Sequence, residues 1–139
     1  MATFNKFNSF VEAIGQKKHN LNADILKLMF TNTLPGPTNA VKVDIIELAA
    51  GNGYVAGGPS TAPNSYVQTT GIAKLLCTDV TVTAVGGSVG PFRYAVLYNS
   101  TALNGELIGW WDYGSSQTLA IGESMTSDFD GVAGVLTNT

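Results

Sequence analysis

Charged side chains are scarce in this chain of 139 residues. They make up 12% of the sequence, about half of the roughly 25% in an average soluble protein. The net charge is −3, and Arg93 is the single arginine. Binding to nucleic acid requires clustered lysine and arginine side chains that neutralise phosphates. The composition therefore argues against a nucleic-acid partner. So little surface charge is typical of a protein that assembles with others, and equally of a neutral soluble domain.

Cysteine and histidine are each present once. Cys77 has no partner within the chain, so no intrachain disulfide forms, and we expect it to be a small core residue. One cysteine and one histidine cannot supply the four ligands of a zinc site. His19 follows two lysines and has no nucleophile beside it, so we expect it to cap a helix or face solvent. The sequence thus predicts no metal and no cofactor.

Long apolar runs are also missing. A membrane-spanning helix needs about 20 consecutive apolar residues, and no run in this sequence approaches that length. The opening MATFNKFNSF lacks the charged start and apolar block of a secretory signal peptide. We therefore expect no association with a membrane.

The clearest positive pattern is a series of short apolar runs, each closed by turn residues. The candidate strands are Asp24–Phe30, Ala73–Ala84, Phe92–Tyr98, Glu106–Tyr113, Thr118–Ile121, Met125–Phe129 and Val132–Leu136. The alternation within the second of these slips near Thr78, where we expect a bulge or bend. Gly114-Ser115-Ser116 should end the fourth strand. Such spacing predicts a mainly β protein, an antiparallel β-sandwich that is jelly-roll-like or immunoglobulin-like.

The N-terminal residues follow a helical period instead. An apolar stripe predicts one short helix over about Lys6–Lys17 and consists of Phe4, Phe7, Phe10, Val11 and Ile14. The chain length fits one domain, which we divide into an N-terminal helical arm (residues 1–20) and a β-sandwich (residues 21–139). Two interpretations stay open: the helix packs on its own sandwich, or its phenylalanine stripe docks on another subunit.

Two further features suggest contact with other subunits. Gly51–Ser65 contains four glycines and two prolines and is predicted to be an exposed loop, long enough to carry a function. On a strand, Trp110 and Trp111 point to opposite faces. Parity with Leu107 and Tyr113 places Trp111 in the core and leaves Trp110 for the surface or an interface, unless both faces are covered. The predicted interface residues are Phe4, Phe7, Phe10, Tyr54 and Trp110.

Carboxylates provide no recognisable catalytic pattern. Asp128 and Asp130 stand as at the start of a calcium loop, but the later ligands and the closing glutamate are missing. A solvated face that ends in a hairpin turn is favoured there. Glu106 and Asp112 remain open as a glycosidase pair, although nothing singles them out. Because no nucleophile–base motif accompanies them, we expect that the protein is not an enzyme.

Several phrases of the sequence resemble a group of small structural proteins of tailed bacteriophages that are encoded among head genes. The phrases are MATFNKFNSFVEAI, LKLMFTNTLP, GPFRYAVLYN, ELIGWWDYG and TSDFDG. The resemblance implies a capsid decoration (cement) protein, which sits on the outside of the virion shell, often as a homotrimer, and bridges capsomers. It implies the major capsid protein and copies of the chain itself as partners, and no catalytic residues.

Two other classes fit the same composition. One is a tail or head–tail connector component. The other is a carbohydrate-binding module that uses an exposed Trp110 as a platform for a sugar ring. The expected location under the resemblance is the capsid surface, after synthesis in the host cytoplasm.

Overall fold

The computed structural model describes residues 3–138 and is built mainly of antiparallel strands. In chain order the described elements are β1 (Phe4–Lys6), α1 (Asn8–Gly15), β2 (Leu26–Thr31), the 3-10 turn η1 (Lys42–Asp44), β3 (Ser65–Thr69), β4 (Ile72–Leu76), β5 (Val80–Thr83), β6 (Val89–Asn99), β7 (Leu107–Leu119), β8 (Ser124–Ser127) and β9 (Leu136–Asn138). The predicted class, a mainly β antiparallel sandwich with one short helix, is confirmed.

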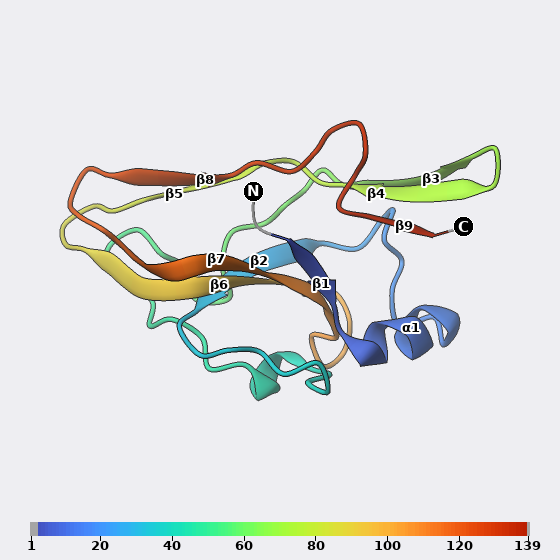
Figure 1. Ribbon diagram of the computed structural model, residues 1–139, viewed down its shortest axis with the longest axis horizontal. Helices are drawn as coiled ribbons and strands as arrows, with labels where there is room; N and C mark the ends of the chain where they lie inside the picture. The colour runs from blue at the N-terminus through green and yellow to red at the C-terminus, as the bar shows by residue number, and fades with distance from the viewer. Residues whose placement is uncertain (1–2, 139) are drawn as a thin grey trace.

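One four-stranded sheet, in the order β1-β7-β6-β2, forms the centre of the molecule. Two smaller sheets, β3-β4-β9 and β5-β8, lie side by side above it in Figure 1. The main core fills the space between these layers, with buried side chains that include Leu28, Leu75, Val82, Phe92 and Leu97. The sandwich therefore has one continuous sheet on one side and a divided layer on the other.

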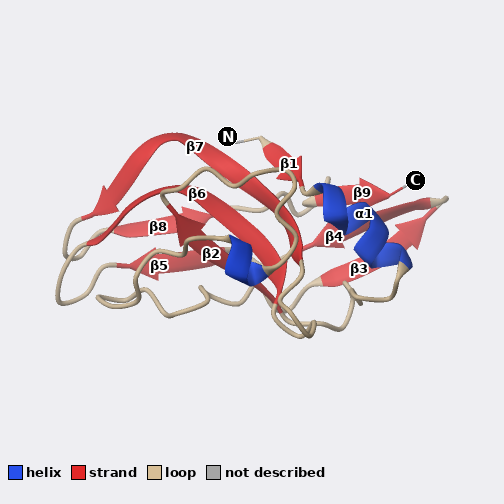
Figure 2. Cartoon of the chain, turned by 90° about the horizontal axis from the view of Figure 1, so that it is seen from below, coloured by secondary structure: helices blue, strands red, loops and turns tan. Residues whose placement is uncertain are grey.

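The neighbouring strands β2 and β6 are buried on both faces. In β6, Ala95 and Leu97 contact the main core, whereas Val96 and Tyr98 belong to a second apolar cluster beneath the sheet. The loop that carries η1 covers this second cluster and lies in front of β2 in Figure 2. A strand that is buried on both faces has a continuous apolar sequence rather than an alternating one, which explains the run YAVLY in β6.

The N-terminal segment belongs to the sandwich and does not form a separate arm. Residues 4–6 pair with β7 as the edge strand β1, and α1 begins only at Asn8, so the predicted helix at Lys6–Lys17 was too long. Phe7 and Phe10 are almost fully buried in the chain's own two apolar clusters. In the structure the helix therefore packs on its own domain, as the first of the two interpretations states. The first two residues of the predicted arm lie outside the described residues.

The segment Ala73–Ala84 is divided between two sheets. It forms β4 in one sheet and β5 in another, and the chain crosses between them at residues 77–79, where the sequence predicted a bulge or bend. At the break the backbone pairs elsewhere, because the N–H of Thr78 donates to the carbonyl of Thr61 at 3.0 Å, and the Asp79 carboxylate accepts the N–H of Phe129 at 2.8 Å. This contact joins the crossing point to the chain after β8.

The last strand starts four residues later than the sequence suggested, at Leu136 instead of Val132. The carboxylate of Asp130 accepts the N–H groups of Val132 and Ala133, each at 2.8 Å. Asp130 and Gly131 therefore start a compact turn and not the tight hairpin that the sequence indicated.

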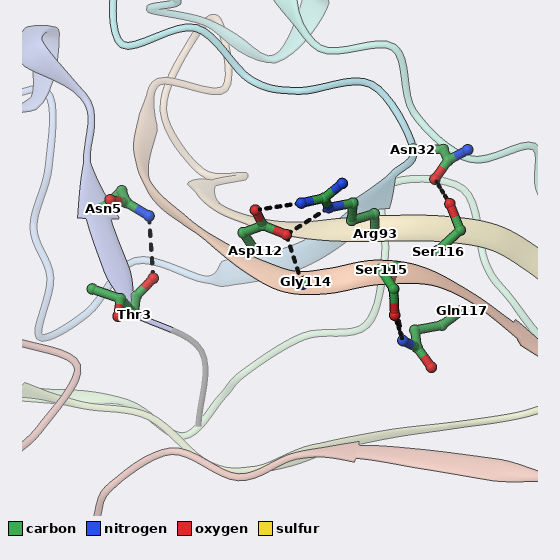
Figure 3. A network of polar contacts seen from close by, with 9 residues as sticks. All are labelled: Thr3, Asn5, Asn32, Arg93, Asp112, Gly114, Ser115, Ser116 and Gln117. Atoms are coloured by element: carbon green, nitrogen blue, oxygen red, sulfur yellow. Dashed lines mark hydrogen bonds and ion pairs between the residues drawn. The ribbon is translucent and has the colours of Figure 1, made fainter.

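β7 continues across Gly114–Ser116, which were expected to end it, by means of a wide bulge. Residues 113–116 of β7 stand opposite residue 93 of β6 alone. Gly114 has φ +88°, a conformation that only glycine adopts without strain. Figure 3 shows how side chains fix the bulge: Arg93 donates two hydrogen bonds to the Asp112 carboxylate (2.8 and 3.2 Å), which also accepts the Gly114 N–H at 2.7 Å.

The outer edge of β2 has no neighbouring strand, and a later segment of the chain satisfies its backbone groups. The N–H of Leu28 donates to the carbonyl of Pro59 at 3.0 Å, and the N–H of Thr61 donates to the carbonyl of Leu26 at 2.9 Å. Gly58 fits here because any Cβ at that position would collide with the carbonyl of Leu28. The loop predicted to be exposed is thus partly a cover for the sheet edge.

Tyr54 completes this cover. Its hydroxyl accepts the N–H of Phe30 at 3.1 Å and donates to the carboxylate of Glu47 at 2.7 Å. Its ring stacks on Phe30 with 5.7 Å between centroids. The N–H of Leu48 donates to the carbonyl of Phe30 at 2.8 Å. Contacts within the single chain therefore explain why Tyr54 is buried.

We predict that Phe7→Ala strongly destabilises the protein. Phe7 has no exposed surface, and replacing a buried phenylalanine by alanine costs about 3–5 kcal/mol. Val11→Ala on the same helix is the matched control, because Val11 is 61% exposed and should change the free energy of unfolding by less than about 0.5 kcal/mol. The measurement is chemical denaturation followed by circular dichroism. Similar losses for the two variants would show that the N-terminal segment is not part of the core.

Candidate functional site

Three of the five predicted interface residues are buried inside the chain itself. Phe7, Phe10 and Tyr54 expose 4% of their surface or less. They have no free surface for another subunit, so their assignment to an interface is corrected. The remaining two, Phe4 and Trp110, are half-buried. Apolar patterning marked all five residues as needing a partner, but for the buried three that partner is the same chain.

The tryptophan pair points to opposite faces of β7, as expected. Trp110 packs on Phe7 with 4.7 Å between ring centroids, whereas Trp111 lies between Phe4 (5.0 Å) and Phe129 (5.6 Å). The expected parity with Leu107 is wrong, because Leu107 belongs to the cluster on the Trp110 side. A register shift between β6 and β7 after the first residue of β7 reverses the alternation. Both indoles are thus partly covered, and Trp110 is not an open platform.

His19 lies in a buried polar cluster and not at the surface. Its Nδ1 accepts from the amide of Asn99 at 3.1 Å, and that amide also donates to the carboxylate of Asp24 at 2.7 Å. Nε2 of His19 and Oε2 of Glu106 have no protein partner within the described residues. Burial lowers the pKa of His19, against the opposing effect of the Glu106 and Asp24 carboxylates. We therefore interpret His19 as a neutral structural residue, and the expectation of a solvent role is corrected.

The open glycosidase pair is not assembled. Glu106 is buried beside Asn104, whose N–H it accepts at 3.1 Å. Asp112 is held in an ion pair with Arg93, which lowers the pKa of the Asp112 carboxyl. A glycosidase needs two carboxylates that face each other across a cleft. These two have separate partners instead.

The first candidate site is a hollow beneath the main sheet, which we call the loop face. It has a volume of about 620 Å³ and is lined by Lys27, Val41, Lys42, Val43, Ala56, Gly57, Tyr98, Ser100, Ala102, Leu103, Asn104 and Gly105. Leu103 is 94% exposed and Val43 is 87% exposed. Two large aliphatic side chains that stand almost entirely in water beside one hollow are typical of a contact surface for another molecule.

Hydrogen bonds fix the loops that form the loop face. The hydroxyl of Tyr98 donates to the carbonyl of Gly57 at 2.7 Å, and its burial raises the pKa of Tyr98 to about 12. The N–H of Leu107 donates to the carbonyl of Ala40 at 3.0 Å. The ammonium group of Lys42 lies 5.6 Å from the centre of the Tyr98 ring. The surface is therefore shaped in advance, which lowers the entropic cost of binding.

The second candidate site opens between the two layers of the sandwich, and we call it the aromatic cleft. Its volume is about 490 Å³, and its lining consists of Phe4, Leu28, Trp111, Tyr113, Thr126, Ser127, Asp128, Phe129, Asp130, Gly134 and Val135. Sequence reasoning placed Asp128 and Asp130 on a solvated face and did not connect them with Trp111. The three meet here because Phe129, in the turn after β8, packs on Trp111 of β7.

Residues 3–138 contain neither a metal-ligand cluster nor a helix that could cross a bilayer. The structure brings together no group of three or more histidine, cysteine, aspartate or glutamate side chains able to hold a metal ion in this range. Within the same residues, no helix has the length and apolar character to cross a bilayer.

Comparisons of the chain with protein-family models, with curated protein sequences and with solved structures give no significant match.

We predict that acid weakens the fold through His19. The unfolded chain takes up a proton near pH 6.5, whereas burial keeps the folded imidazole neutral to lower pH. The unfolded state therefore binds more protons, so stability is full above about pH 6.5 and declines as the pH falls. Urea denaturation between about pH 7 and pH 5 should show this slope.

The matched variants are His19→Gln and Lys18→Gln. Glutamine does not titrate, so His19→Gln should lose less stability than the wild type over the same pH interval. Lys18 is exposed, and Lys18→Gln should keep the slope of the wild type. Equal slopes in all three proteins would show that His19 is not the titrating group.

Proposed function

We propose that this protein is a non-enzymatic virion structural protein, a capsid decoration protein that binds the outer surface of the shell and stabilises it. The observation that carries the proposal is the loop face, where Leu103 and Val43 are almost fully exposed beside a preformed hollow. The sequence resemblance to phage head-region proteins supplies the partner, which is the major capsid protein.

The chemistry of the loop face suits a mainly apolar contact. Its lining contains aliphatic side chains and two lysines, Lys27 and Lys42, and no carboxylate. Exposed apolar surface gains free energy when water is excluded from it, by about 25 cal/mol for each Å². Lys27 and Lys42 favour a partner surface that carries carboxylates around its apolar centre, because opposite charges orient an encounter.

Shell stabilisation follows from mass action. A protein that binds only the assembled shell stabilises that state by its free energy of binding. Copies of the chain, as a homotrimer, would present several loop faces at one capsomer joint and raise the avidity.

A tail or connector component remains the alternative. Copy number in the purified virion separates the two, since hundreds of copies fit decoration and about a dozen fit a tail.

We predict that Leu103→Asp and Val43→Asp abolish attachment to capsids without unfolding the protein. Each change places a charge in the contact, where it is left without water or a partner. Val132→Asp is the matched control, because Val132 is 82% exposed but lies outside the loop face. The measurement is co-sedimentation of each variant with undecorated capsids. Undiminished binding of Leu103→Asp and Val43→Asp would exclude the loop face as the contact.

We also predict that decorated particles melt at a higher temperature than undecorated ones, and that the difference survives about 1 M salt. At that ionic strength the screening length is only about 3 Å, so exposed ion pairs are weakened while apolar contacts persist. Differential scanning fluorimetry of particles with and without the protein, at low and high salt, makes the comparison. Identical melting would argue against a cement role, and release by salt alone would show an electrostatic interface.

A further inference from the structure

The aromatic cleft has no part in the capsid contact proposed above. It lies between the layers of the sandwich, whereas the loop face lies beneath the main sheet, so both can be occupied together. We propose that the aromatic cleft binds a neutral saccharide unit. Its volume of about 490 Å³ is within the range of roughly 300–1,000 Å³ for small-molecule sites.

The wall of the cleft is aromatic and held in place before any ligand arrives. Phe4 and Phe129 flank Trp111 with centroid distances of 5.0 and 5.6 Å. Tyr113 is braced by an edge-on contact with Phe92 at 6.3 Å. Sugar rings present faces of C–H bonds that pack against such apolar, electron-rich surfaces. A fixed wall avoids the entropy cost of ordering side chains on binding.

The rim of the cleft is polar and rich in hydroxyl groups. The hydroxyls of Tyr113 and Ser127 lie 3.2 Å apart. Either of these two hydroxyls can donate, so both can reorient toward a ligand. The carboxylate of Asp128 is exposed and has no hydrogen-bond partner among residues 3–138. A carboxylate accepts hydrogen bonds from two neighbouring hydroxyls, as a sugar ring offers them.

The charged side chains that line the aromatic cleft favour some classes of ligand over others. The lining contains Asp128 and Asp130 and no lysine or arginine, which disfavours anionic ligands. Asp130 is already engaged by the two backbone N–H groups of its turn. The available Asp128 carboxylate and the hydroxyls of Tyr113 and Ser127 match a neutral polyol, which both donates and accepts hydrogen bonds, better than a quaternary ammonium ion, which donates none. We therefore assign Trp111, Tyr113 and the Asp128 carboxylate to the binding of one saccharide unit.

The test is a titration followed by nuclear magnetic resonance of the intact protein, with maltose, cellobiose and diacetylchitobiose as probes. The two indole N–H signals report separately: Trp111 lines the cleft, and Trp110 packs on the other face of β7. We expect at least one disaccharide to shift the Trp111 signal saturably at a Kd of about 1 mM, while the Trp110 signal stays in place.

Two variants distinguish a specific site from general sugar contact. Asp128→Ala removes the free acceptor and should raise the Kd at least tenfold. Glu12→Ala removes an exposed carboxylate on α1, outside the cleft, and should leave the Kd unchanged. Both positions are exposed, so neither change should disturb the fold.

Tetramethylammonium is the competing probe. A saturable Trp111 shift with this cation and none with the three disaccharides would overturn the proposal and assign the cleft to organic cations. No shift with any probe at about 50 mM, well above a millimolar Kd, would overturn it as well. Equal affinity of Asp128→Ala and the wild type would exclude the role given to the rim.

Discussion

The outer edge of β2 is the constraint on which much of the structure depends. This strand is buried on both faces and ends the main sheet, so its outward N–H and C=O groups need partners. A segment far along the sequence provides them through Pro59 and Thr61, and the hydroxyl of Tyr54 completes the set. Covering one edge therefore determines the path of the chain from Leu48 to Thr61 beside and beneath the sheet.

The loop face is a consequence of that path. Once Tyr54 and Glu47 hold the covering segment, Gly57 reaches the hydroxyl of Tyr98, a residue of the central strand β6. The η1 turn and the loop around Leu103 then flank a hollow with rigid walls. Its aliphatic side chains remain in water because the interior volume beneath the sheet is already occupied by Met29 and its neighbours.

Local patterns predicted the β class, because period-2 runs and turn residues act over only a few positions. Local patterns did not predict which surface an apolar side chain packs against. The stripe that contains Phe7 looks the same in sequence whether it packs on its own sheet or on another subunit. Leu103 and Val43 are sixty residues apart, so no periodicity joins them. The aromatic cleft depends similarly on a turn near Asp130 that folds back on the other end of the chain.

The wide bulge in β7 has a consequence for the behaviour of many copies at high local concentration. Among residues 3–138, β1 pairs only with Gly109–Trp111 of this strand, so in that range the stretch beyond Trp111 forms an outer boundary of the main sheet. A regular ladder there would offer a template on which another chain could extend the sheet without limit. The irregular backbone at Gly114, locked by Asp112, removes that regular spacing. This irregular edge therefore disfavours pairing of β7 with a strand of another copy of the chain.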